Sequence, residues 1–116
     1  MNTSAPLLVA CFCAQWCGSC RDYVATFDAA AAAHGAACRF IWIDIEDEAA
    51  LVDGVEVENF PTLLIAQAQR PLFFGPITPQ PQMLARLVSG ALAGDLAALP
   101  SHPELDAITA RLQASS

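Results

Sequence analysis

Four of the chain's five cysteines lie between residues 11 and 20, in the pattern C-x-C-x3-C-x2-C. Thiols this close together exchange electrons, bind a soft metal such as zinc, or fill part of a hydrophobic core. The last two, Cys17 and Cys20, have the C-x-x-C spacing, which occurs both in redox-active pairs and in zinc sites. The spacing alone does not decide among these chemistries, so the surrounding elements must.

The Cys17/Cys20 pair stands where a strand is expected to end and a helix to begin. The unpaired N–H groups and positive dipole end of a helix favour a thiolate over a thiol. Cys17 comes first, at the more exposed end of the motif, and is therefore the expected nucleophile. Cys20, one turn deeper, would resolve a mixed disulfide by attacking Cys17.

The elements around the pair form a βαβ unit. The apolar run 6–14 predicts a buried strand, with Cys11 and Cys13 on one of its faces. A helix is predicted over 19–34, ended by Gly35, with a buried stripe at Val24, Phe27 and Ala31. A second strand follows over 38–45, and a strand–helix–strand unit of this length makes the two strands parallel.

The rest of the chain completes a layered α/β domain. An acidic stretch, 46–54, suits a helix start, and two short strands at 61–67 and 70–75 predict a hairpin. Amphipathic helices are predicted over 80–94 and 101–116. Their apolar positions are Leu84, Leu87, Val88, Ala91 and Leu92 in the first, and Leu105, Ile108 and Leu112 in the second; Ser101 and Glu104 have capping-box spacing. The order β-α-β-α-β-β-α plus a C-terminal helix predicts a three-layer sandwich around a mixed four-stranded sheet, with residues 95–116 an extension of one domain spanning 1–94.

Composition excludes several classes of protein. At 116 residues the chain is expected to form one domain, and 55% apolar residues exclude disorder for most of its length. A net charge of −7 with five Lys and Arg residues argues against nucleic acid as a partner.

The longest apolar stretch, 5–14, is too short to cross a bilayer. Residues 1–6 lack the positive charge of a leader, so "LVAC" is not expected to be a lipoprotein cleavage box. We expect a cytoplasmic monomer whose thiols stay reduced.

The stretch "QWCGSC" between strand and helix, followed much later by "NFPT" before a strand, resembles the thioredoxin family over Leu7–Gly94. The resemblance implies a thioredoxin-like protein-disulfide oxidoreductase. It assigns the active-site motif to Trp16, Cys17, Gly18, Ser19 and Cys20. It also makes Pro61 a cis-proline and Phe60 the residue whose backbone pairs with a bound substrate chain, and Gly75 fits the same pattern.

The same resemblance implies that no bound cofactor is needed beyond the redox-active disulfide Cys17–Cys20. The implied partners are a disulfide-bearing protein substrate and an external electron donor, either a reductase or glutathione. The chain departs from the family in three ways. Only six residues precede Leu7, so the family's first strand–helix unit is expected to be absent. Ser19 stands where thioredoxin usually has proline. Cys11 and Trp42 stand where the family has a buried aspartate and its lysine neighbour.

Cys11 and Cys13 keep three interpretations open. Free cysteines are often buried as small hydrophobes, so both could fill the core. Either cysteine could instead be an auxiliary redox partner, and Cys11 could offer Cys20 a second disulfide partner. A four-thiolate metal site is disfavoured, because two thiols on one strand face lie about 6.5 Å apart and are oriented by the sheet; no metal is expected. Without the family's buried aspartate, proton transfer during resolution of the mixed disulfide is left to water or to another carboxylate such as Glu46. The same absence favours an alternative function, a binding or chaperone-like module with little redox turnover.

Overall fold

The computed structural model describes residues 7–14, 18–35, 38–47, 49–52, 61–67, 70–78, 80–100 and 102–114. The elements follow the predicted order. They are strand β1 (Leu7–Cys13), helix α1 (Gly18–His34), strand β2 (Cys38–Asp44), the short 3-10 helix η1 (Ala49–Val52), strands β3 (Thr62–Gln67) and β4 (Arg70–Pro76), and helices α2 (Pro81–Leu92) and α3 (Pro103–Ala114). Within the described ranges, the acidic stretch contributes only the single turn of η1.

The four strands form one mixed sheet in the order β2-β1-β3-β4. β1 is parallel to β2 and antiparallel to β3, and β3 and β4 form an antiparallel hairpin with a register shift between Ile65 and Ala66. The predicted parallel pair and the predicted hairpin are both confirmed. Every residue of β1 is buried because the strand has a neighbour on each side and helices on each face.

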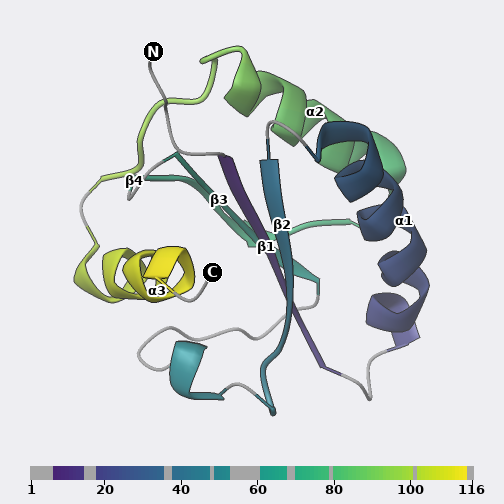
Figure 1. The fold of residues 1–116 in the computed structure, drawn as a ribbon, viewed down its shortest axis with the longest axis horizontal. Coiled ribbons are helices and arrows are strands. Elements are labelled where there is room, and N and C mark those ends of the chain that lie inside the picture. Colours follow the sequence, from purple (N-terminus) through teal and green to yellow (C-terminus); the bar gives the residue numbers. More distant parts are fainter. Residues whose placement is uncertain are drawn as a thin grey trace.

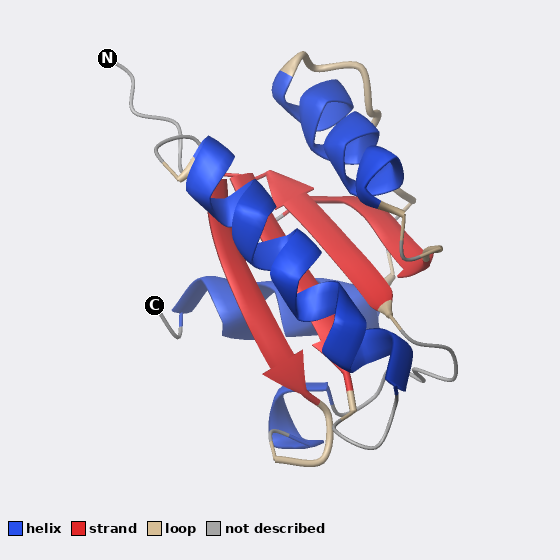
Figure 2. Cartoon of the chain, turned by 90° about the vertical axis from the view of Figure 1, so that its right-hand side faces the viewer, coloured by secondary structure: helices blue, strands red, loops and turns tan. Residues whose placement is uncertain are grey.

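Helices cover both faces of the sheet, which gives the expected three layers (Figure 1). Figure 2 shows α1 and α2 in front of the strands and α3 behind them. Alternate residues of β1 therefore enter two separate cores. The core under α1 and α2 contains Leu7, Val9, Cys11 and Cys13 of this strand, and the core under α3 contains Leu8, Ala10 and Phe12.

The buried stripe of α1 differs from the predicted one. Val24 is 39% exposed, whereas Cys20, Tyr23 and Phe27 are buried. Phe27 meets the rings of Phe40 and Trp42 on β2 edge to face, with centroids 5.2 and 5.6 Å away. Because aromatic rings bury the most apolar area, Tyr23 and Phe27 rather than Val24 determine which side of α1 faces the sheet.

The end of α2 also differs from the expectation. Leu84, Val88 and Ala91 are buried as predicted, but Leu92 is 43% exposed. The helix stops at Leu92, and the chain turns away through Gly94, whose φ of 80° is in the left-handed region that glycine tolerates. Leu92 is therefore the last residue of α2 and lies mostly outside the core, next to the buried Ala91.

Helix α3 closes the second core with the three residues predicted for it, Leu105, Ile108 and Leu112. The predicted cap Ser101 lies outside the described residues; in the structure the Leu105 backbone N–H donates to His102 Nδ1 at 3.1 Å. The Arg39 guanidinium donates to the Leu112 carbonyl at 3.1 Å, which ties β2 to the C-terminal end of α3. The first contact caps the start of α3, and the second holds the helix across the sheet.

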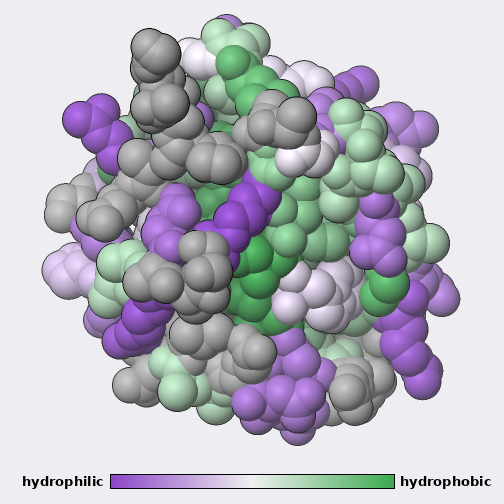
Figure 3. All heavy atoms as spheres, viewed as in Figure 1, coloured by the Kyte–Doolittle hydropathy of each residue, from purple (hydrophilic) through white to green (hydrophobic). Residues whose placement is uncertain are grey.

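The side of the molecule along edge strand β2 is mixed in character. Apolar atoms gather over the middle of this strand, between hydrophilic side chains (Figure 3). Phe40, Ile41 and Trp42 of β2 are only half-buried. Among the described residues, no helix is both long and apolar enough to cross a membrane.

Candidate functional site

Four segments that are separate in sequence meet at one end of the sheet. Cys13 is the last residue of β1, and its carbonyl accepts a hydrogen bond from the Ile45 N–H at 2.9 Å. Thr62, the first residue of β3, pairs with Phe12, so Pro61 lies at the same end as Cys13. The Pro61 carbonyl accepts a hydrogen bond from the Ile77 N–H at 3.0 Å. This end of the sheet therefore brings the "NFPT" proline to the side of the cysteine-bearing strand.

A disulfide joins Cys13 to Cys20, which lies in the first turn of α1. Their Cα atoms are 5.8 Å apart, a separation typical of disulfides. Both residues are buried, each only 1% exposed. The sequence predicted Cys17 as the partner of Cys20, and Cys17 lies outside the described residues, so that pairing stays a prediction.

Cys13 is the partner of Cys20 in the structure, and the sequence did not single it out for that place. The two-residue period of β1 places Cys11 and Cys13 on the helix-facing side together, as predicted. Of the two, Cys13 is at the strand end that leads into α1, within seven residues of Cys20. The available signal was this position, which made Cys13 a better partner for Cys20 than Cys11.

Cys11 remains a free, fully buried thiol directly beside the disulfide. Its Sγ lies 3.7 Å from Cys13 Sγ, and because a disulfide sulfur carries no proton, the Cys11 thiol is the donor. Burial raises the pKa of Cys11 to about 12, so the thiol stays protonated at neutral pH. Cys38 is the other free, buried cysteine of the described chain, and burial raises its pKa too.

Tyr23 adds a polar group to the same core. Its hydroxyl is buried and has no hydrogen-bond partner in the structure. Burial raises the pKa of the Tyr23 hydroxyl, and a negative charge on Cys11 would raise it further. Register pairs Cys11 with Trp42, so the two residues that replace the acid and the lysine are direct neighbours. Among the described residues, no carboxylate is buried beside the disulfide.

The thioredoxin family model matches residues 1–75. The chain belongs to the thioredoxin family. No curated protein sequence matches it. The fold agrees with the family, because the open mixed sheet and its flanking helices are those of a thioredoxin-like sandwich.

Solved thioredoxins have the same fold at low sequence identity. The thioredoxin of Trypanosoma brucei brucei is 26% identical, with a TM-score of 0.68 and 78% of each chain covered. The germline-specific thioredoxin Deadhead of Drosophila melanogaster is 23% identical, with a TM-score of 0.66, over 72% of this chain and 79% of its own. Fasciola hepatica thioredoxin is 21% identical, with a TM-score of 0.67, over 74% and 81%.

The remaining residues of the thioredoxin motif are placed in part. Gly18 is exposed at the start of α1, and Ser19 follows it in the same turn. Pro61 is buried, while Trp16 and Phe60 lie outside the described residues. Gly75 lies within β4, opposite Leu63 and next to Pro76, which pairs with Thr62. Gly75 is therefore one residue into the sheet from the end that carries Cys13.

Glu46 is exposed, in the turn after β2, where its backbone N–H donates to the Asp44 carboxylate at 2.9 Å. The described ranges contain no group of three or more His, Cys, Asp or Glu residues arranged to hold a metal ion. Cys13 and Cys20 are already joined to each other.

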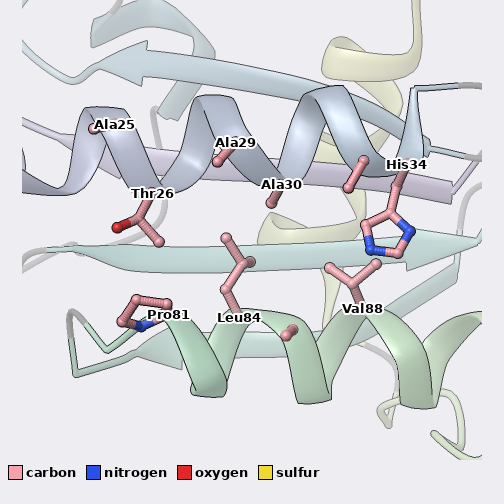
Figure 4. Close-up of a pocket in the computed structure, with 10 residues that line it drawn as sticks. Ala25, Thr26, Ala29, Ala30, His34, Pro81, Leu84 and Val88 are labelled. Carbon is pink, nitrogen blue, oxygen red and sulfur yellow. The ribbon is translucent and has the colours of Figure 1, made fainter.

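A groove of about 450 Å³ runs between α1 and α2, away from the cysteines. Figure 4 shows Thr26, Ala30 and His34 of α1 on the side that faces Leu84 and Val88 of α2. Thr26 and His34 are the polar side chains among its lining residues. With one hydroxyl and one imidazole at separate places on α1, the groove offers no arrangement for acid–base or redox chemistry.

Proposed function

We propose that this thioredoxin-family protein is a thiol–disulfide oxidoreductase that acts on disulfides of protein substrates, with Cys17 as nucleophile and Cys20 as resolving cysteine. The observation that carries the proposal is the state of Cys20: it lies in the first turn of α1 and is able to form a disulfide there, which in the structure joins it to Cys13. The C-x-x-C spacing and family membership support the same chemistry.

The reaction consists of two exchanges. The Cys17 thiolate attacks one sulfur of the substrate disulfide, which breaks that bond and leaves the electron pair on the other substrate sulfur, where a proton joins it. The Cys20 thiolate then attacks Cys17 in the mixed disulfide and releases the second substrate thiol. The substrate gains two electrons and the protein becomes the Cys17–Cys20 disulfide. A reductase or glutathione, as external donor, returns two electrons to the pair.

A substrate chain would be held by backbone hydrogen bonds at Phe60, beside the Pro61 loop, in the manner of a strand added to an open backbone edge. The position of Pro61 at the Cys13 end of the sheet supports this role. Trp16 and Gly75 are the further residues that we assign to substrate contact.

The absence of the family's buried aspartate predicts that Cys20 resolves the mixed disulfide slowly. General acid–base assistance contributes about 10²- to 10⁴-fold where it operates. The Cys11 thiol cannot replace it near neutral pH, because burial raises its pKa to about 12. Cys20 would then lose its proton to water, and turnover should rise with pH over the range in which cysteine thiols ionise.

Reduction of insulin disulfides with dithiothreitol as donor tests the proposal. We expect Cys17→Ser to lose turnover and Cys38→Ala, which changes a buried cysteine at the start of β2, to keep it. Wild-type turnover that survives in Cys17→Ser would overturn the assignment of the nucleophile.

One observation favours a second candidate, a binding module with little turnover: the described core has no carboxylate beside Cys20. Such a module would bind unfolded insulin chains equally well in the wild type and in Cys17→Ser, and neither protein would reduce them above the rate of dithiothreitol alone.

A further inference from the structure

Three sulfurs lie together under α1, at the end of β1. Cys13 Sγ is bonded to Cys20 Sγ, and Cys11 Sγ lies 3.7 Å from Cys13 Sγ. The three residues share one core cluster with Tyr23. A two-cysteine exchange enzyme needs only Cys17 and Cys20, so the structure contains one more disulfide-forming residue than the reaction proposed above uses.

We propose that Cys13 is a third redox-active cysteine, which exchanges with Cys17 for the sulfur of Cys20. The inference rests on the proposed function, because that function supplies the Cys17–Cys20 disulfide. In the exchange, the Cys13 thiolate attacks Cys20, the Cys13–Cys20 bond forms, the Cys17–Cys20 bond breaks, and the electron pair leaves on Cys17. The proton of Cys13 goes to solvent, and no outside oxidant or reductant is consumed.

The backbone is already placed for this exchange. The Cα atoms of Cys13 and Cys20 are 5.8 Å apart, so their bond fits the positions that β1 and α1 occupy. The hydrogen bond from the Ile45 N–H to the Cys13 carbonyl fixes the end of the strand. Cys20 can therefore bond to Cys13 while β1 and α1 stay in place.

Cys11 supports the Cys13 thiolate. A thiolate in an apolar core is costly unless it receives a hydrogen bond. The Cys11 thiol, which stays protonated because burial raises its pKa to about 12, donates toward Cys13 over 3.7 Å. The Tyr23 hydroxyl is a second buried donor in the same cluster and has no partner in the structure. Cys11 is thus a positioning residue, and Cys13 is the one that exchanges.

The exchange gives the oxidised protein two forms with different access. Both sulfurs of the Cys13–Cys20 disulfide belong to residues that are 1% exposed, so an external thiol has little access to them. The way back is attack by Cys17 on Cys20, which restores the Cys17–Cys20 pair. While Cys13 holds Cys20, Cys17 is a free thiol that can form mixed disulfides that Cys20 does not resolve.

Peptide mapping distinguishes the two forms. The wild-type protein is oxidised with glutathione disulfide, its free thiols are blocked with N-ethylmaleimide, and it is cleaved by chymotrypsin after Phe12, Trp16 and Tyr23. A Cys13–Cys20 bond links peptide 13–16 to peptide 17–23 and leaves the blocking group on Cys17. A Cys17–Cys20 bond closes a loop inside 17–23 and leaves the blocking group on Cys13.

We expect the linked peptides in the wild type, with the blocking group on Cys17, and their loss in Cys13→Ala. Cys38→Ala is the control, because it removes another free, buried thiol of the same core cluster and leaves both exchange partners intact. It should keep the linked peptides, as should Cys17→Ser, in which Cys20 has no other partner within the motif.

If the wild type shows only the looped peptide 17–23, the inference fails, whatever the variants do. Insulin reduction by the same preparations separates that failure from failure of the proposed function. If turnover requires Cys17 and no linked peptide is found, the oxidoreductase proposal holds, but Cys13 takes no part in the reaction. Linked peptides without Cys17-dependent turnover overturn the oxidoreductase and, with it, the exchange that depends on it.

Discussion

The two faces of β1 carry different kinds of side chain, although they belong to the same seven-residue strand. The face toward α1 and α2 carries Cys11 and Cys13 among its apolar side chains. The face toward α3 carries no sulfur; Phe12 meets Phe74 there, edge to face, with ring centroids 6.1 Å apart. The period of two along a strand thus separates a core that contains cysteines from one that contains none.

The comparison shows what the face toward α3 contributes. A disulfide can change partner without refolding only if the strand that carries one sulfur stays fixed. Helix α3 and the Phe12–Phe74 pair hold β1 from the face that carries no cysteine. We therefore expect substitutions under α3 to change stability, and substitutions under α1 to change the thiol chemistry.

The largest expected effect on stability comes from Phe12→Ala, on the α3 face. Phe12 is fully buried, and Phe→Ala in a core costs about 3–5 kcal/mol. Urea unfolding would measure the loss, with Val24→Ala as a control on an exposed side chain, where the expected change is within about 0.5 kcal/mol. Disulfide mapping of the folded fraction of Phe12→Ala should match the wild type; an altered pairing would remove the distinction between the two faces.

The next effect belongs to the Cys13–Cys20 bond. Closing a loop between residues seven apart stabilises a chain by about 2 kcal/mol in the entropic model. We expect oxidised Cys17→Ser to have a higher unfolding free energy than the same variant in dithiothreitol by that amount. The double variant Cys13→Ala/Cys17→Ser should show no dependence on reductant. An equal response of both variants would show that the Cys13–Cys20 bond does not form.

A smaller effect follows from Cys11. Its folded pKa of about 12 lies above the ordinary value of 9.0, so between these values the unfolded chain loses a proton that the folded chain keeps. Stability from this group is fully present below about pH 9 and is lost as pH rises, by at most about 1.4 kcal/mol per pH unit. Burial shifts the pKa values of Tyr23 and Cys38 in the same direction, so the decline should be shallower in Cys11→Ala but not abolished.

Urea unfolding in the presence of reductant, repeated between about pH 8 and pH 11, measures this slope without disulfide rearrangement. Identical slopes in the wild type and Cys11→Ala would contradict a buried, protonated Cys11.

The sequence was sufficient for the topology, because β1 and β2 are short apolar runs joined by one helix, and only a parallel pair satisfies that connection. It was insufficient for the rotation of α1, since Val24 and Tyr23 compete for the sheet and only packing against Phe40 and Trp42 decides. The candidate site was predicted through its C-x-x-C motif. Cys13 was not singled out as the partner of Cys20. The two-residue spacing of Cys11 and Cys13 places both on one face of β1, but it does not show which of them lies nearer to the start of α1.

The most direct test of the central claim is to trap a substrate on the double variant Cys13→Ala/Cys20→Ser, which lacks the resolving cysteine Cys20 and its second partner Cys13. We predict that incubation with an oxidised, disulfide-bearing protein leaves a stable mixed disulfide, and that mass spectrometry maps it to Cys17. The absence of an adduct, or an adduct on Cys11 or Cys38 instead, would contradict the assignment of Cys17 as the nucleophile.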